Sequence, residues 1–474
     1  MISKQDILER AREWGLRPEV VEKDYVLGWL LTAVALNDDI AATWILKGGT
    51  CVKKCHFETY RFSEDLDFSL LPEAEYSEEA IAATLRELAE TCTDLSGIEF
   101  DLASLAVRKR LDKLERRTFE GKLGYKGPLA VPGWPRILFD ITQHEPIIDE
   151  PVLRAILHPY PDGPLPVDAL VSTYSMEELI AEKTRALYER SRPRDLYDVV
   201  YILTNSADAI ALAHARDVFA DKCIAKQLAV PSADDIVRVV GEAPELVSEW
   251  TNMLEHQLPS LPTVDGILER LPGALAWLRR VGDYGVEKVA PSVPALVPVA
   301  SGTGEVPLAR EPFTLWRAGA PLETVRFAAA NRLLVQFVYS GKLRTVEPYS
   351  LRKSNPGNIL LYAWETESGR IKAFDVKKMT VLKAMTRTFV PRYKIELSSS
   401  GTIASDILIP ERTPVRGVRR SSRRTSSGPV HVFRCPACNK EFRHKTSDPT
   451  LRRHRMSSDG PYCSSRRGSL ERFV

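Results

Sequence analysis

The stretch "LKGGTCVKKCHFETYRFSEDLDFSL", from Leu46 to Leu70, places a Gly-Gly-Thr turn fifteen residues before the first carboxylate of Asp65-Leu66-Asp67, which lies in an apolar run. Side chains two residues apart on a strand share one face, so these carboxylates repel each other unless a cation lies between them. Hard oxygen ligands suit Mg²⁺. The stretch therefore predicts a cation site beside a turn whose glycines let a triphosphate approach the backbone.

Two further segments supply groups that suit the same chemistry. In "RILFDITQ", Asp140 closes an apolar strand, and a third carboxylate would complete a two-metal clamp for phosphoryl transfer. In "SMEELIAEKTRALYERSRPRDLYDVVYI", from Ser175 to Ile202, a helix carries Lys183 and Arg185 before several more Arg and Asp residues. Such a cluster can hold phosphates and a leaving pyrophosphate through bidentate and point-charge contacts. A helix surface laced with salt bridges is the plainer interpretation of this second segment.

These pieces together resemble the nucleotidyltransferase superfamily with the DNA polymerase β-type fold, whose signature is Gly-Gly-Ser/Thr, then Asp-x-Asp, then an Asp on a later strand. The sequence more closely resembles the AbiEii/AbiGii toxin family of abortive-infection and type IV toxin–antitoxin systems. The matching pieces occur in the family's order: "VEKDYVLGWLL", "LKGGT", "RFSEDLDF", "FDI" and the segment Ser175–Ile202. The resemblance implies an α+β fold, a polymerase β-type nucleotidyltransferase with a helical C-terminal part.

The resemblance also implies roles for single residues. The three aspartates would hold Mg²⁺, Lys183 would grip the triphosphate, and Asp195 or Asp198 would order the basic residues around the site. The residues expected to be catalytic are Asp65, Asp67, Asp140, Lys183 and Asp198. The residues expected to bind the nucleotide are Gly48, Gly49, Thr50, Ser63, Lys183, Arg185, Arg194 and Asp195.

These roles predict Mg²⁺-dependent transfer of a nucleoside monophosphate from a nucleoside triphosphate (NTP) to an acceptor hydroxyl. The resemblance points to RNA as the acceptor, at the 3′ end of a transfer RNA, and to the toxin of a phage-defence system with a possible antitoxin partner. A protein hydroxyl is an alternative acceptor. A second alternative is a nucleic-acid-binding regulator that keeps the transferase fold only as a scaffold. The complete set of catalytic residues favours the enzyme.

Composition shifts along the chain predict three domains. The expected ranges are 1–285 for the nucleotidyltransferase, 286–312 for a linker, 313–397 for a second domain, 398–430 for a basic linker and 431–474 for a zinc-finger-like domain. The second domain, with "VQFVYSGKLRTVEPYSL" and "GRIKAFDVKKM", resembles a WYL domain, a small Sm-like β-barrel. It departs at the eponymous tripeptide, where Ile359-Leu360-Leu361 stands. Its basic and aromatic residues, Arg344, Tyr349, Arg352, Arg370 and Lys372, suit a nucleotide effector or single-stranded nucleic acid. Solvated strand faces are the plainer interpretation.

The C-terminal segment carries a Cys-x2-Cys pair, Cys435 and Cys438, followed by His454 and Cys463. Four such ligands suit tetrahedral Zn²⁺, and the segment resembles a C₂H₂-type zinc finger with irregular spacing. His444 is an alternative for the fourth ligand. The basic residues expected to contact nucleic-acid phosphates are Arg443, Lys445, Arg452, Arg453 and Arg455.

Charge is distributed unevenly along the chain. The segment Glu411–Val474 has sixteen Lys/Arg and five Asp/Glu, whereas the whole chain has a formal net charge of only +2. A basic end on a mildly acidic body favours a polyanionic partner such as RNA. No apolar run approaches the roughly 18 residues of a membrane helix, the N-terminus lacks the apolar core of a signal peptide, and seven cysteines in so long a chain do not make a disulfide framework. We therefore expect a cytoplasmic protein without membrane contact.

Overall fold

The structure is a computed structural model of the 474-residue chain. It describes residues 1–71, 76–111, 116–163, 165–166, 169–279, 306–307, 322–353, 358–399, 431–444, 451, 463, 465, 467 and 469–473. The chain forms two compact units, Met1–Ser405 and Asp406–Val474. The predicted nucleotidyltransferase and WYL-like segments thus belong to one unit. The predicted linkers 286–312 and 398–430 lie outside the described residues, apart from Val306–Pro307 and residues 398–399.

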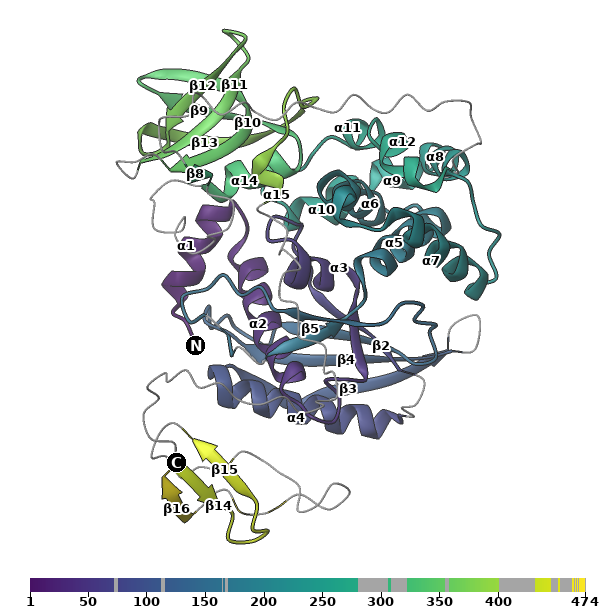
Figure 1. Cartoon of the computed structure of the whole chain (residues 1–474), viewed down its shortest axis with the longest axis vertical. Coiled ribbons are helices and arrows are strands. Elements are labelled where there is room, and N and C mark those ends of the chain that lie inside the picture. Colours follow the sequence, from purple (N-terminus) through teal and green to yellow (C-terminus); the bar gives the residue numbers. More distant parts are fainter. Residues whose placement is uncertain are drawn as a thin grey trace, which may run out of the picture. The chain divides into compact units, whose positions relative to one another are not determined.

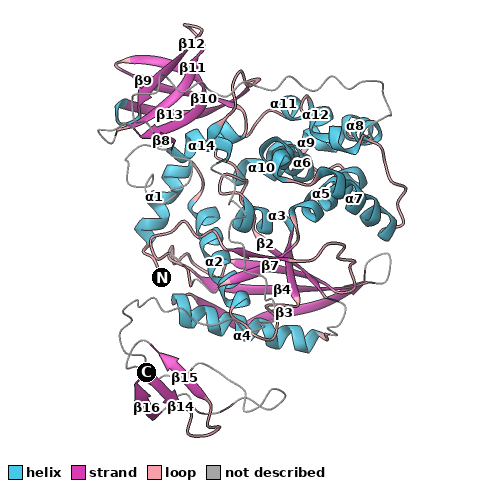
Figure 2. Cartoon of the chain, viewed as in Figure 1, coloured by secondary structure: helices cyan, strands magenta, loops and turns pink. Residues whose placement is uncertain are grey.

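A seven-stranded mixed sheet forms the centre of the first unit, in the order β3-β4-β5-β2-β1-β7-β6 (Figure 2). Its strands are β1 (Trp44–Lys47), β2 (Asp65–Leu70), β3 (Glu99–Leu111), β4 (Arg117–Lys126), β5 (Arg136–Thr142), β6 (Val152–Ala155) and β7 (Leu170–Thr173). Along β2, Leu66 and Phe68 are fully buried, whereas Asp65 and Asp67 are only partly covered. The period-two alternation therefore sends the carboxylates to one face of the sheet and the apolar side chains to the other.

Helices lie on both sides of this sheet. In Figure 1, α4 runs along one side and the helical part that begins with α5 lies on the other. The helices are α1 (Lys4–Trp14), α2 (Pro18–Ala35), α3 (Gly48–Cys51), α4 (Glu78–Ser96), α5 (Met176–Arg190), α6 (Pro193–Ser206), α7 (Leu212–Ala225), α8 (Ala233–Gly241), α9 (Pro244–Ser248), α10 (Trp250–Leu254), α11 (Val264–Leu268) and α12 (Leu271–Ala274). Local sequence sets their ends: α1 starts in a Ser3–Asp6 capping box and stops at Gly15, whose φ is 67°. None of the helices described is long and apolar enough to cross a membrane.

A second sheet follows in the same unit, in the order β12-β11-β10-β9-β13, with β8 beside β10. Its elements are β8 (Val306–Pro307), α14 (Leu322–Ala330), β9 (Leu333–Tyr339), β10 (Lys342–Lys353), β11 (Ile359–Glu365), β12 (Arg370–Asp375), β13 (Met379–Thr388) and α15 (Glu396–Ser399). The strand pairs described leave β12 and β13 at opposite ends of an open path. The closed Sm-like barrel therefore stays a prediction.

The charges expected to form a ligand surface on this second sheet are used within it. Arg344 and Lys372 both pair with the buried Glu365, the former at 2.8 Å. Arg352 pairs with Glu396 at 3.1 Å. These ion pairs engage Arg344, Lys372 and Arg352 within the second sheet, whereas Arg370 is exposed. The ligand surface stays a prediction.

Helix α14, with Asn331 just after it, joins the second sheet to the part of the unit that holds the seven-stranded sheet. The guanidinium of Arg326 donates to Glu58 at 2.5 Å, and the Tyr197 hydroxyl on α6 donates to Asn331 at 2.7 Å. Arg326 and Asn331 are 3% and 2% exposed. Because both contacts are polar and buried, the two parts are fixed to each other by bonds that water cannot readily replace.

The second unit contains a three-stranded sheet in the order β15-β14-β16. A hairpin of β14 (His431–Arg434) and β15 (Glu441–His444) pairs with the C-terminal strand β16 (Ser469–Phe473). The predicted phosphate-contacting residues Lys445, Arg452, Arg453 and Arg455, and the predicted ligand His454, lie outside the described residues. The backbone of Arg443 lies in β15.

Candidate active site

The predicted carboxylates lie in one row across the sheet. Strand register places Lys47 opposite Asp67, Asp67 beside Asp140 on the parallel strand β5, and Asp140 opposite Glu120. Directly paired residues share a face, and adjacent strands are about 4.8 Å apart. Asp65 lies two residues before Asp67 and therefore on the same face. The sheet thus brings together the three aspartates that the sequence singled out.

Burial, and at Asp67 also the neighbouring aspartates, destabilise the negative charge of the carboxylates in this row. Burial, and then the neighbouring Asp140, raise the pKa of Asp67 to about 6. Burial also raises the pKa values of Asp65 and Asp140 above their ordinary range. A group of carboxylates held in this way favours a bound cation, because a cation removes both the repulsion and the cost of burying negative charge.

The two glycines of the Gly-Gly-Thr segment leave room for motif side chains. Gly48 has a φ of +74°, and a Cβ there would lie 2.1 Å from the Asp67 Oδ2. A Cβ on Gly49 would lie 2.9 Å from the Ser63 Oγ and 3.0 Å from an Arg61 guanidinium nitrogen. From the sequence, these glycines were predicted to let a triphosphate approach the backbone. In the structure they are required, first of all, because Asp67, Ser63 and Arg61 pack directly on them.

Thr50 ties this segment to the start of β2. Its hydroxyl donates to the Asp65 carbonyl at 2.5 Å, and the side chain is buried. The bond fixes α3 against the strand that carries the aspartates. This contact therefore sets the position of the Gly-Gly-Thr segment relative to Asp65.

Asp198 is the centre of the basic part of the site. Its carboxylate, on α6, accepts two bonds from Arg61 at 2.6 and 2.8 Å and one from Lys183, on α5, at 2.8 Å. The Asp198 side chain is fully buried, whereas that of Lys183 is 12% exposed. Burial works against ionisation, but the two cations hold the pKa of Asp198 well below its usual range. Asp198 therefore stays an anion that orients both cations.

Arg61 was missed by sequence reasoning. It lies in "RFSEDLDF", two residues before Ser63, but its partner Asp198 is 137 residues further along the chain. Gln257 Oε1 accepts a further bond from Arg61 at 3.0 Å. An arginine in an otherwise apolar and acidic run was the available signal, since a buried guanidinium requires an anion nearby.

The other predicted basic and acidic residues of the Ser175–Ile202 segment have bonding partners other than Asp198. Arg185, two residues from Lys183 on the helix, bonds Glu189 at 2.5 Å. Asp195 accepts two bonds from Arg190 at 2.7 and 2.8 Å. Arg194 donates to the Met253 carbonyl at 3.4 Å and interacts with the charges of both Arg61 and Asp65. Of the two alternatives, it is Asp198 that orders Lys183, while Asp195 orders Arg190.

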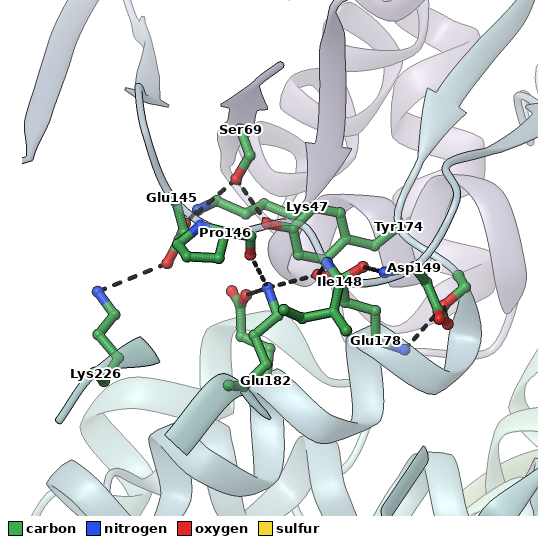
Figure 3. Close-up of polar contacts among 12 residues, drawn as sticks. Lys47, Ser69, Glu145, Pro146, Ile148, Asp149, Tyr174, Glu178, Glu182 and Lys226 are labelled. Atoms are coloured by element: carbon green, nitrogen blue, oxygen red, sulfur yellow. Dashed lines mark hydrogen bonds and ion pairs between the residues drawn. The ribbon is translucent and has the colours of Figure 1, made fainter. Parts of the chain in front are cut away.

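A second polar network lies beside the carboxylate row (Figure 3). The Lys47 ammonium donates to Glu145 rather than to Asp67. Glu145 also faces Lys226 at 3.6 Å and accepts a bond from Ser69 at 3.3 Å, and Ser69 contacts the Tyr174 hydroxyl at 2.7 Å. The network links β1 and β2 to the loop after β5. It keeps the Lys47 ammonium bonded to Glu145, and the charge of Lys47 opposes but does not cancel the effect of burial on the pKa values of Asp67 and Asp140.

The loop after β5 is anchored by a buried lysine of α7. Lys222 contacts Glu178 at 2.6 Å, Glu182 at 3.3 Å and the Pro146 carbonyl at 2.9 Å (Figure 3). Glu178 in turn accepts the backbone N–H of Ile148 at 3.0 Å. Helix α5, which carries Lys183, is therefore fixed to the strand that carries Asp140.

The donors fit a hard cation by their chemistry. Asp65, Asp67 and Asp140 are oxygen ligands on one face, and no amine bonds any of them directly among the bonds described. The ligand oxygens of these three aspartates do not all lie within 4.8 Å of one another. Among the described residues, only a cluster of three cysteines has its ligand atoms that close together.

The Gly-Gly-Thr segment lies in helix α3 rather than in the predicted turn, and together with the row of aspartates and the buried Lys183–Asp198 pair it gives the arrangement that the resemblance to nucleotidyltransferases predicts. Residues 29–271, more than half of the chain, match the family model described as "Nucleotidyl transferase AbiEii toxin, Type IV TA system". The chain therefore belongs to the AbiEii nucleotidyltransferase toxin family.

Among solved structures, the chain is similar to MenT4, a nucleotidyltransferase toxin from Mycobacterium tuberculosis H37Rv. The similarity has 22% sequence identity and a TM-score of 0.37, and it covers 59% of this chain and 90% of that one. No curated protein matches the chain.

Proposed function

We propose that this nucleotidyltransferase toxin transfers a nucleoside monophosphate from an NTP to an RNA hydroxyl in a Mg²⁺-dependent reaction. The row of Asp65, Asp67 and Asp140 on one face of adjacent strands carries the proposal. These carboxylates would hold Mg²⁺, which when bound neutralises the triphosphate and lowers the cost of developing charge. The acceptor oxygen forms a bond to the α-phosphorus, the bond from that phosphorus to the bridging oxygen breaks, and pyrophosphate leaves as the hydroxyl loses its proton.

The residues of the chain have separate tasks in this reaction. The Lys183 ammonium, 12% exposed and oriented by Asp198, presents positive charge to the phosphates. Arg61 holds Asp198 from the buried side and so fixes the direction of Lys183. Gly48 lets Asp67, and Gly49 lets Ser63 and Arg61, lie close to the backbone of α3. Fixed charges of this kind act without reorganisation at the moment of reaction.

The charge of the chain supports RNA as the acceptor. The segment Glu411–Val474 carries sixteen Lys/Arg and five Asp/Glu, which favours a polyanion over a protein surface. The 3′ end of transfer RNA is the particular acceptor that we propose. An antitoxin protein would be the partner that suppresses this activity in the cell, in keeping with the type IV family.

The test uses purified full-length protein, Mg²⁺, total cellular RNA and each α-³²P-labelled NTP in turn. We expect RNA to become labelled, and we expect this labelling to be lost when EDTA is added or when Asp67→Asn is used. The control is Glu120→Gln, which should keep the labelling. Glu120 is the next carboxylate of the row and is already paired with Arg110 at 2.8 Å. Label that resists RNase and is removed by protease would replace RNA by a protein acceptor. Undiminished labelling by Asp67→Asn would refute the catalytic role of the aspartate row. Absence of label in both RNA and protein with the wild type would favour a regulator with a scaffold-only transferase fold.

A further inference from the structure

The C-terminal unit brings three cysteines together. The sulfur atoms of Cys435, Cys438 and Cys463 all lie within 4.8 Å of one another, and none of the three is in a disulfide. Cys435 and Cys463 are 28 residues apart in sequence, yet their Sγ atoms are 3.5 Å apart. This distance far exceeds a disulfide bond of about 2.05 Å. It is close to the roughly 3.8 Å that separates two thiolates on one tetrahedral zinc ion with Zn–S bonds of about 2.3 Å.

Backbone hydrogen bonds shape the turn that carries two of these cysteines. The Cys435 N–H donates to the Lys440 carbonyl at 2.9 Å, and the Asn439 N–H donates to the Cys435 carbonyl at 2.9 Å. Asn439 adopts a φ of 60°, a left-handed conformation that asparagine tolerates better than most residues. The turn between β14 and β15 is therefore closed around the Cys-x2-Cys pair, as a binding knuckle requires.

The apolar core around these cysteines is small. Among the described residues it consists of Phe433, Phe442 and Leu451 together with Cys435 and Cys463, with Cys438 packed against it. So few apolar side chains do not offset the conformational entropy of ordering three strands. A unit of this size needs a cross-link, and the three thiols occupy the position where one would lie.

We propose that Cys435, Cys438 and Cys463 bind one structural Zn²⁺ ion that holds the β14–β15 hairpin to the C-terminal strand β16. Three thiolates leave one position of a tetrahedral ion for a further ligand. The site differs from the predicted finger because a third strand pairs with the hairpin, and it stands on three cysteines without His454. It does not depend on the transferase proposal, since its residues belong to the other compact unit.

Metal analysis of the full-length protein, purified without chelator, tests the proposal. We expect about one zinc per chain, a fall of about fivefold or more in Cys435→Ser and Cys463→Ser, and no change in Cys92→Ala, a buried cysteine of α4. Zinc-edge X-ray absorption of the wild type should show three sulfur ligands at about 2.3 Å. This second measurement decides the issue even where a serine variant fails to fold.

Limited proteolysis gives a readout that does not involve activity. Removing zinc with a chelator should make the C-terminal unit sensitive to trypsin while cleavage within residues 1–279 is unchanged, and added Zn²⁺ should restore protection. The proposal is overturned by zinc content that is the same in wild type and Cys435→Ser, or by an absorption spectrum without sulfur ligands. RNA labelling that fails while zinc is present would refute the transferase proposal alone.

Discussion

The two cations that share Asp198 should behave differently when each is removed. Arg61 is 4% exposed and makes two charge-assisted bonds to Asp198, with one further bond to Gln257. Lys183 is 12% exposed and makes one bond to the same carboxylate. Arg61→Met therefore breaks a buried ion pair, which costs about 3–5 kcal/mol of unfolding free energy. Lys183→Met leaves the stronger partner in place and should cost only about 1–2 kcal/mol.

Activity should rank the two variants in the opposite order. We expect Lys183→Met to lose transfer by about 100-fold or more, because its charge faces the phosphates. Arg61→Met should lower the rate of transfer by about tenfold at a temperature where it stays folded. In this variant Lys183 still bonds Asp198, but Arg61 no longer holds the Asp198 carboxylate in place. Urea unfolding followed by tryptophan fluorescence and single-turnover labelling measure the two quantities.

A double-mutant cycle separates charge loss from packing loss. In an Asp198→Asn background the carboxylate charge is absent, so the cost of Arg61→Met should fall by about 2 kcal/mol or more. Equal costs for Arg61→Met and Lys183→Met would refute the reasoning. So would a cost for Arg61→Met that does not change in the Asp198→Asn background.

Three other perturbations test separate parts of the structure. Gly48→Ala should abolish transfer, because the new Cβ would collide with the Asp67 carboxylate. It should also lower the free energy of unfolding by more than the roughly 1–2 kcal/mol that a left-handed backbone costs a non-glycine residue. The control is Gly133→Ala, at a φ of +80° with no atom within 4 Å of its Cβ, which should cost only that strain and keep activity in the same unfolding and labelling assays. Burial lowers the pKa of Lys53 to about 8, whereas the unfolded chain holds this proton to about 10.5. Between these pH values the unfolded state binds more protons than the folded state. The free energy of unfolding of the wild type, relative to that of Lys53→Met, should therefore rise with pH by up to about 1.4 kcal/mol per pH unit. Urea unfolding of both proteins at pH 7.5 and 9.5 measures this difference, and a constant difference would contradict the prediction. Asn331→Ala should cost about 1–3 kcal/mol by leaving the Tyr197 hydroxyl on α6 unpaired, and thermal unfolding unchanged from wild type would count against that contact.

Local sequence predicted the strands of the site well. The apolar runs at Asp65-Leu66-Asp67 and before Asp140 are strands, β2 (Asp65–Leu70) and β5 (Arg136–Thr142), although β5 continues for two residues past Asp140. Such elements follow from local patterns of burial. The row of Asp65, Asp67 and Asp140 could be predicted because the family's order of motifs implies it.

Contacts between distant segments could not be predicted. The pairing of Arg61 with Asp198 and of Lys47 with Glu145 depends on which strands and helices become neighbours in space. The reason for Gly49 was likewise hidden, since Arg61 and Ser63 reach it only in the folded chain. Charge runs on a single helix do not show which side chain points to the site, and so Arg185 and Lys183 could not be told apart.

Helix α14 has a consequence for how the protein unfolds. Its Arg326 holds Glu58, three residues before Arg61, and Asn331 holds the residue next to Asp198 on α6. The family match ends at residue 271, before this helix begins. Loss of the second sheet would therefore free the two segments that orient Lys183. The transferase part and the second sheet should melt in one cooperative step, and a fragment that ends before Leu322 should be both less stable and less active than the whole unit.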